Sequence, residues 1–224
     1  MRRNVHLTIL LFFVFMTGTV LAQSAGNLFF VFLNPNPAKP LISKDQANGI
    51  RAAHLQNLDR LSEQGIIKAS GSFEDGGDML IMATDNIDHA NQLLQADPTI
   101  KDNLFRAEVF PLSIANNWVC GAGKPYTLVT YQLVRFRFND DYFGDLDKMA
   151  HDTRIFMANL NNTKDFVMMQ GNFSIYNEGV LVLNVPTKEE AEKIIKKDPA
   201  VSHGQVLYEI RPLKIAKGTF CKHK

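Results

Sequence analysis

One eight-residue pattern occurs twice in this chain and constrains its fold more than any other feature. Residues 108–115 and 209–216 both read Glu-x-x-Pro-Leu-x-Ile-Ala, at a separation of 101 residues. Several other pairs keep nearly that spacing: Gly71 and Gly171, Phe73 and Phe173, Asp97-Pro98 and Asp198-Pro199, and Cys120 and Cys221. A unit of about 100 residues can hold its own core, so the pattern predicts a duplicated domain rather than a solenoid of short repeats.

Both copies show the same succession of strand and helix patterns. The first copy predicts a strand over 28–33, a helix from Ser43 to Gly65, a hairpin over 66–70 and 79–83, a helix capped by Asp85 that ends at Asp97-Pro98, and a strand over 105–112. The second copy predicts strands over 127–138, 165–170, 180–185 and 205–215, and helices over 141–160 and 188–197, the last capped by Thr187. The order in each copy is βαββαβ, the ferredoxin-like arrangement.

A four-stranded sheet with helices on one face leaves its other face apolar and uncovered. Two such sheets can bury these faces against each other within one chain. We therefore expect an α+β fold in which two ferredoxin-like halves, residues 23–117 and 126–224, pack sheet to sheet. Residues 118–125, which include Gly121 and Gly123, are the expected linker.

The N-terminus has the three-part pattern of a secretory signal peptide. Arg2 and Arg3 precede an apolar run over residues 7–16, and Val20-Leu21-Ala22 offers small residues for cleavage before Gln23. The alternative is a membrane anchor, but the apolar run is shorter than the roughly 20 residues that a spanning helix needs. We expect residues 1–22 to be removed and the mature protein to be secreted or periplasmic, with no stable membrane anchor.

Composition and motifs exclude several classes of function. The chain has 23 acidic and 24 basic residues, and no basic run before residue 222, so we expect no nucleic-acid partner. It has no phosphate loop, dinucleotide fingerprint or Gly-x-Ser-x-Gly motif, so we expect no cofactor. His89 and His203 have no cysteine or histidine at metal-ligand spacing, so we expect no metal. In an exported chain, Cys120 and Cys221 are either a disulfide between the copies or two independent thiols.

A set of residues in the first copy has the order and spacing of one known family: Arg51-x-x-His54, Leu58, Gly65, Ile66-Ile67, Ala69-x-Gly71, Gly77, Leu80, Ala90 and Asp97-Pro98. This set resembles the YciI-like (YCII-related) family, whose members are small dimeric α+β barrel proteins. The resemblance implies that this chain builds the same barrel from two covalently joined halves, as an intrachain dimeric α+β barrel. Such a pseudodimer is expected to be a monomer or a weak homo-oligomer.

The resemblance also implies a site in the first copy. The family carries a histidine on a helix, here His54, with an acidic residue beside it, matched here by Asp97. His54 is then the general acid or base, and Arg51, on the same helical face, binds an anionic group of a small organic molecule. Ser72 stands where the family usually has proline, which makes the pocket lip more polar. The alternatives are that Asp97 only ends a helix and that His54 is an ordinary helix residue.

The second copy is expected to have lost this site. Counting back from Gly171 places Arg154 opposite His54, whereas aligning Leu160 with Leu61 places Thr153 there. His151 reaches that position only with about three extra residues in the following loop. We expect an exported, cofactor-independent enzyme of the lyase, hydrolase or isomerase type, with one competent pocket. The alternatives are a non-catalytic small-molecule-binding protein and a structural barrel protein.

Overall fold

The fold of the chain is taken from a computed structural model that describes residues 27–114, 119–120, 122, 125–163, 165–174 and 178–221. The expected signal peptide lies outside the described residues, as do residues 118, 121, 123 and 124 of the expected linker. Among the described residues, no helix combines the length and the apolar character needed to cross a membrane.

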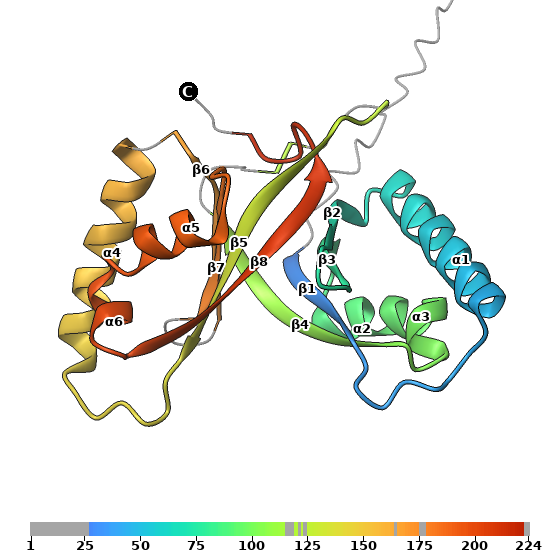
Figure 1. Cartoon of the computed structure of the whole chain (residues 1–224), viewed down its shortest axis with the longest axis horizontal. Helices are drawn as coiled ribbons and strands as arrows, with labels where there is room; N and C mark the ends of the chain where they lie inside the picture. Colours follow the sequence, from blue (N-terminus) through green and yellow to red (C-terminus); the bar gives the residue numbers. More distant parts are fainter. Residues whose placement is uncertain are drawn as a thin grey trace, which may run out of the picture.

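Within the described residues, each half contains four strands and three helices in the same order (Figure 1). The first half consists of β1 (Asn27–Pro35), α1 (Lys44–Glu63), β2 (Ile67–Phe73), β3 (Asp78–Thr84), α2 (Ile87–Gln95), α3 (Pro98–Lys101) and β4 (Phe105–Ile114). The second half consists of β5 (Leu128–Phe138), α4 (Leu146–Thr163), β6 (Val167–Phe173), β7 (Gly179–Leu183), α5 (Lys188–Ile195), α6 (Pro199–Ser202) and β8 (Val206–Ala216). The short helices α3 and α6 are additions to the predicted βαββαβ pattern. The two halves have the same order of elements, which agrees with a duplication; the duplication stays a prediction.

The eight strands form one closed antiparallel barrel in the order β1-β3-β2-β8-β5-β7-β6-β4. Helices α1 to α3 lie on one side of the barrel and α4 to α6 on the other (Figure 1). The halves join at two short seams, where β2 pairs with β8 through residues 71–73 and 213–215, and β4 pairs with β6 through residues 112–114 and 171–173. The predicted α+β barrel of two joined halves is confirmed.

The repeated glycines lie at these seams. A Cβ atom on Gly71 would lie 2.9 Å from Leu213 Cδ1 and 3.0 Å from the Lys214 carbonyl oxygen. A Cβ atom on Gly171 would lie 2.6 Å from Leu112 Cδ1. These distances are shorter than ordinary non-bonded contacts, so a side chain at either position would force the leucine of the other half to move. Packing between the halves therefore accounts for one of the repeat's landmarks.

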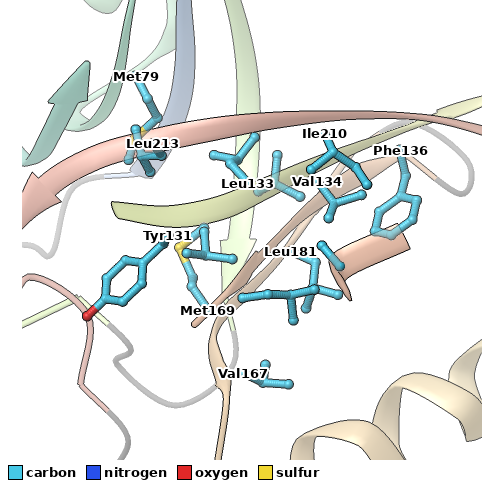
Figure 2. Packing of buried hydrophobic residues seen from close by; sticks show 14 of the residues in the cluster. Met79, Tyr131, Leu133, Val134, Phe136, Val167, Met169, Leu181, Ile210 and Leu213 are labelled. Atoms are coloured by element: carbon cyan, nitrogen blue, oxygen red, sulfur yellow. The ribbon is translucent and has the colours of Figure 1, made fainter. Parts of the chain in front are cut away.

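Apolar side chains from both halves fill the barrel. The Phe30 ring packs at a tilt against Phe32, with 4.7 Å between ring centroids, and against Phe173, with 5.7 Å between ring centroids. Figure 2 shows labelled side chains of β5 to β8, including Leu133 and Met169, which belong to the same cluster of buried residues. The Arg135 guanidinium lies 4.5 Å from the Phe32 ring centroid, which joins the halves by a cation–π contact.

Two predicted helix starts are wrong. The N-cap of α2 is Asn86, not Asp85, because the Asn86 side chain accepts a hydrogen bond from the His89 amide. Helix α4 begins at Leu146 rather than residue 141, because turns occupy the preceding segment. Asn139 accepts the amides of residues 141 and 142, and Asp145 then accepts the Lys148 amide as a cap would.

Cys120 and Cys221 form a disulfide with 5.7 Å between their Cα atoms. Next to it, Val119 and Phe220 make an isolated antiparallel bridge, and the Cys120 amide donates to the Thr219 carbonyl over 2.8 Å. The bond therefore joins the segment between the halves to the end of the second half, and not one βαββαβ unit to the other.

Candidate functional site

The candidate site begins at His54, which α1 carries on its buried face. This face also holds Leu58 and Leu61, and the His54 side chain is 1% exposed. Ser43 starts the helix with a capping box, in which its side chain accepts the Gln46 amide and the Gln46 side chain accepts the Ser43 amide. This fixed start sets the helical register that turns His54 inward.

Asp97 lies against one edge of the His54 ring. Nδ1 of His54 is 2.9 Å from each carboxylate oxygen of Asp97. The same carboxylate caps α3 by accepting the Thr99 amide over 3.0 Å, and it also accepts the Thr99 hydroxyl and the Asn57 side-chain amide. Asp97 therefore begins α3, rather than only ending the helix before it, and it also contacts the histidine.

Asp78 lies against the opposite edge of the ring. Nε2 of His54 is 3.4 Å from Oδ2 of Asp78, an ion-pair distance, and neither atom has a hydrogen-bond partner. Oδ1 of Asp78 accepts the Ser72 hydroxyl over 2.6 Å. Sequence analysis missed Asp78. The available signal was an acidic residue at the first position of a buried apolar strand, where a carboxylate requires a partner.

The two carboxylates keep His54 protonated. Burial by itself disfavours the charged imidazole, but interactions with Asp78 and Asp97 outweigh burial and raise the pKa of His54 to about 9. Burial likewise disfavours charge on Asp97, yet its hydrogen bonds from His54, Thr99 and Asn57 lower the pKa of that carboxyl. At neutral pH the site is thus an imidazolium ring between two carboxylates.

A cavity of about 690 Å³ opens next to this cluster. Ser72, Asp78 and Arg51 line it from the first half, whereas Lys214 and Thr219 line it from the second half. His54 is not on its wall. The second half reaches this cavity because β8 pairs with β2 at the seam.

The four predicted site residues thus differ in their access to the cavity. Ser72 is on the wall and contacts Asp78, while His54 and Asp97 lie behind Asp78. Arg51 is exposed and makes no hydrogen bond or ion pair with the described residues. Its guanidinium is therefore available to a ligand.

The second half keeps the carboxylate but not the histidine. Thr153 of α4 donates its hydroxyl to Oδ1 of Asp198 over 2.8 Å, in the place of the His54 to Asp97 contact. This contact supports the alignment of Thr153, rather than Arg154, with His54, and His151 is exposed elsewhere on α4. Gly179 pairs with Asn172 as Asp78 pairs with Ser72, so the second carboxylate is also missing.

Within the described residues, no group of three or more histidine, cysteine, aspartate or glutamate side chains is arranged to hold a metal ion. The His54 cluster itself contains one imidazole and two carboxylates. The imidazolium form that these carboxylates favour has no lone pair for a metal. The chemistry this arrangement supports directly is proton transfer.

Comparison with known proteins gives a family match in the first half. The model of the YCII-related domain matches residues 28–113, which run from β1 into the last residues of β4. The chain has no match among curated proteins.

Two solved structures share the fold of most of the chain, and a third is similar to a part of it. A proposed chlorite dismutase is 9% identical with a TM-score of 0.52, over 88% of this chain and 95% of its own. A proposed monooxygenase from Fusobacterium nucleatum subsp. nucleatum is 10% identical with a TM-score of 0.51, over 89% of this chain and 99% of its own. The 5-chloro-2-hydroxyhydroquinone dehydrochlorinase of Burkholderia phenoliruptrix is 25% identical over 37% of this chain and 89% of its own, with a TM-score of 0.30. At these identities the first two comparisons establish the barrel fold.

Proposed function

Because residues 28–113 are a YCII-related domain with a buried acid–base cluster, we propose that this chain is a cofactor-independent enzyme acting on a small organic molecule. In this proposal Asp78 exchanges a proton with the substrate, and His54 and Asp97 position and support it. Ser72 and Arg51 bind the substrate. Export of the mature protein is part of the proposal, on the basis of the N-terminal sequence.

The observation that carries the proposal is the continuous line from Asp97 through His54 to Asp78, which ends at a cavity wall. Burying three charged groups costs free energy, because each ion loses its hydration. A cluster kept at this cost is a candidate functional site. A reactive carboxylate with a fixed polar environment is what general acid–base catalysis requires.

The chemistry assigned to Asp78 is a reversible proton transfer. Oδ2 is buried against the imidazolium, so Oδ1, which accepts the Ser72 hydroxyl, is the oxygen assigned to the substrate proton. The proton moves from a substrate C–H or O–H to Oδ1, and the electron pair remains on the substrate or expels a leaving group. Asp78 then returns the proton to the product or to water. Isomerase and lyase reactions fit this balance without a further reactant.

Arg51 provides the proposed recognition of the substrate. It lies three residues before His54 on α1 and lines the same cavity as Asp78. A guanidinium without an ion-pair partner favours a carboxylate or phenolate, which it can bind through two hydrogen bonds. We therefore propose a small organic acid or phenol as the substrate class.

The test is a ligand screen followed by an exchange assay. Organic acids, phenols and lactones are screened by thermal shift against the mature wild type, Asp78→Asn and the control Asp59→Asn, which removes another carboxylate of the cavity wall. A ligand at about 100-fold excess over its dissociation constant stabilises the native state by roughly 2.7 kcal/mol. Each hit is then incubated in deuterated water and followed by NMR for deuterium incorporation or conversion.

The proposal expects exchange or turnover with wild type and Asp59→Asn, and a loss of at least about 100-fold with Asp78→Asn, the usual size of a general-base effect. Ligands that stabilise all three proteins without exchange or conversion would instead establish a small-molecule-binding protein. The incomplete site in the second half favours that second candidate, since binding needs no proton-transfer residues. Absence of any ligand would contradict both.

A further inference from the structure

The second half contains a cavity that the proposed chemistry of the first half does not use. It has a volume of about 420 Å³ and lies between α4 and the strands β6 and β7. Its walls come entirely from the second half, in contrast to the composite cavity beside Asp78. This volume is in the range of pockets that hold small ligands.

The cavity occupies the place of the missing site residues. Thr153 and Gly179, the counterparts of His54 and Asp78, are both on its wall, and Asp198 is at the same wall. Where the first half has an imidazole ring and a carboxylate, the second half has a hydroxyl and a hydrogen atom. Such replacements leave space unless the surrounding structure collapses into it.

The backbone prevents the cavity from being refilled from β7. A Cβ atom on Gly179 would lie 2.3 Å from the Gly171 carbonyl oxygen. This oxygen belongs to β6, which the seam with β4 holds in place through Leu112 to Ile114. The space is therefore fixed by the same strand pairing that closes the barrel.

The walls define the chemistry of an occupant. Phe136, Met157, Leu181 and Val206 supply apolar surface, and the side chain of Asp198 is 1% exposed. Oδ1 of Asp198 accepts the Thr153 hydroxyl and the Ala200 amide, while Oδ2 makes no hydrogen bond with the described residues. A cation comparable to His54 is lacking beside Asp198 in the described part of the chain.

The buried carboxyl of Asp198, whose Oδ2 makes no hydrogen bond with the described residues, determines the polar group of the ligand. Burial raises the pKa of Asp198, although its hydrogen bonds from Thr153 and Ala200 oppose this shift. A carbonyl oxygen placed beside Oδ2 favours the protonated carboxyl, which then donates a hydrogen bond to that oxygen. An anionic group at this inner end would meet a buried acid, and the rim carries Glu178 as well as Arg154.

We propose that the second half has its own binding site for an uncharged, ring-sized organic molecule with one hydrogen-bond acceptor, seated between Thr153, Gly179 and Asp198. The site binds without proton-transfer chemistry, since neither the imidazole nor the second carboxylate is present. It is independent of the function proposed for the first half.

The probe for this site is acetophenone, an aromatic ring with one carbonyl acceptor. Amide resonances of the mature protein are followed during titration, and we expect saturable shifts centred on Gly171, Gly179 and Leu181. The dissociation constant should be about 1 mM or lower, a modest affinity for a ligand of this size. Benzoate, with the same ring but a negative charge, should bind at least about 5-fold more weakly, since its carboxylate faces a buried acid.

Thr153→His returns the first-half side chain to the cavity and should weaken acetophenone binding at least about 10-fold by filling the space. Ala158→Trp, at an exposed position on the cavity wall, should do the same and serves if the first variant does not fold. Ser72→Ala alters only the first-half cavity and should leave acetophenone binding unchanged.

Three outcomes overturn the inference. One is the absence of saturable shifts up to about 10 mM, a concentration at which even a weak ligand binds. Another is binding that survives a folded Thr153→His or Ala158→Trp, or that Ser72→Ala removes. The third is benzoate binding as tightly as acetophenone, which would show that the assigned ligand class is wrong.

Discussion

The two halves differ in what occupies the space between the long helix and the sheet. In the first half, α1 and β3 place His54 and Asp78 next to Asp97, so the space between helix and sheet is filled by charges that neutralise one another. In the second half, Thr153 and Gly179 leave that space open, and no described residue contacts Asp198 as His54 contacts Asp97. The same fold therefore tolerates either a compact charged cluster or an uncharged cavity. The difference depends on two positions, which are His54 and Asp78 in the first half and Thr153 and Gly179 in the second.

The strongest test of this difference removes the cation from the first half. His54→Ala leaves Asp78 and Asp97 buried without their partner, and the free energy of unfolding should fall by about 3–5 kcal/mol at neutral pH. Urea unfolding followed by circular dichroism measures this loss. Thr153→Ala is the matched change in the second half, and an equal loss there would contradict the contrast between the two interiors.

A second test uses pH. The pKa of His54 is about 9 in the folded protein, against 6.5 for the free side chain, so the folded state holds the proton more tightly. The resulting stabilisation of the folded state is fully present below pH 6.5 and is lost as pH rises through 9. It amounts to roughly 3 kcal/mol.

Urea midpoints measured across this window check the expectation. The slope should flatten in His54→Gln, which has no ionisable side chain at this position. NMR titration of the His54 ring gives its pKa directly, and a value near 6.5 would show that the carboxylates do not hold the proton. The contribution of Asp97 to stability depends on pH in the opposite sense. Because its pKa is lowered in the folded protein, this stabilisation is present above pH 3.8 and is lost as pH falls.

A third test attempts to rebuild the missing carboxylate. Gly179→Asp restores the residue found at the equivalent position of β3, but its Cβ atom meets the Gly171 carbonyl oxygen. We expect a loss of stability of about 2 kcal/mol, the size of other backbone clashes in packed cores. The unfolding midpoint measures it. A stability equal to that of the wild type would mean that β6 and β7 can separate locally.

The smallest expected effect comes from Thr153→Val, which keeps the side-chain shape and removes the hydroxyl that Asp198 accepts. A loss of about 1 kcal/mol is expected for one hydrogen bond to a buried group. The loss should shrink at low pH, because a protonated Asp198 needs the donor less. A loss that does not change between neutral and acidic pH would argue that Asp198 is already protonated at neutral pH, the form that its burial favours.

The sequence predicted much of the fold because the repeat and the apolar periodicities are local signals. Helix α1, both hairpins and the Asp-Pro elements lie close to their predicted positions. The spacing within α1, together with the family resemblance, also predicted that Arg51, His54 and Asp97 belong to one site. These features depend on residues a few positions apart or on a match along a continuous segment.

Asp78 and the composite cavity escaped prediction for a different reason. Asp78 joins the cluster through its register opposite Ser72, which depends on how the turn between β2 and β3 closes. Lys214 and Thr219 reach the cavity through the pairing of β8 with β2, more than 130 residues apart in the chain. Helical turns reveal contacts between near neighbours, whereas strand register and barrel closure are set by the whole chain.

The bond between Cys120 and Cys221 has a consequence for the connectivity of the oxidised protein. It converts residues 120–221, the whole second βαββαβ unit, into a covalent ring attached to the first half at one point. A single peptide cut anywhere in that ring would release no fragment until the sulfurs are reduced. New chain ends could therefore be placed in an exposed turn of the second half, such as residues 139–145, while the old ends stay joined. In an oxidising compartment, the second half is topologically a circular protein.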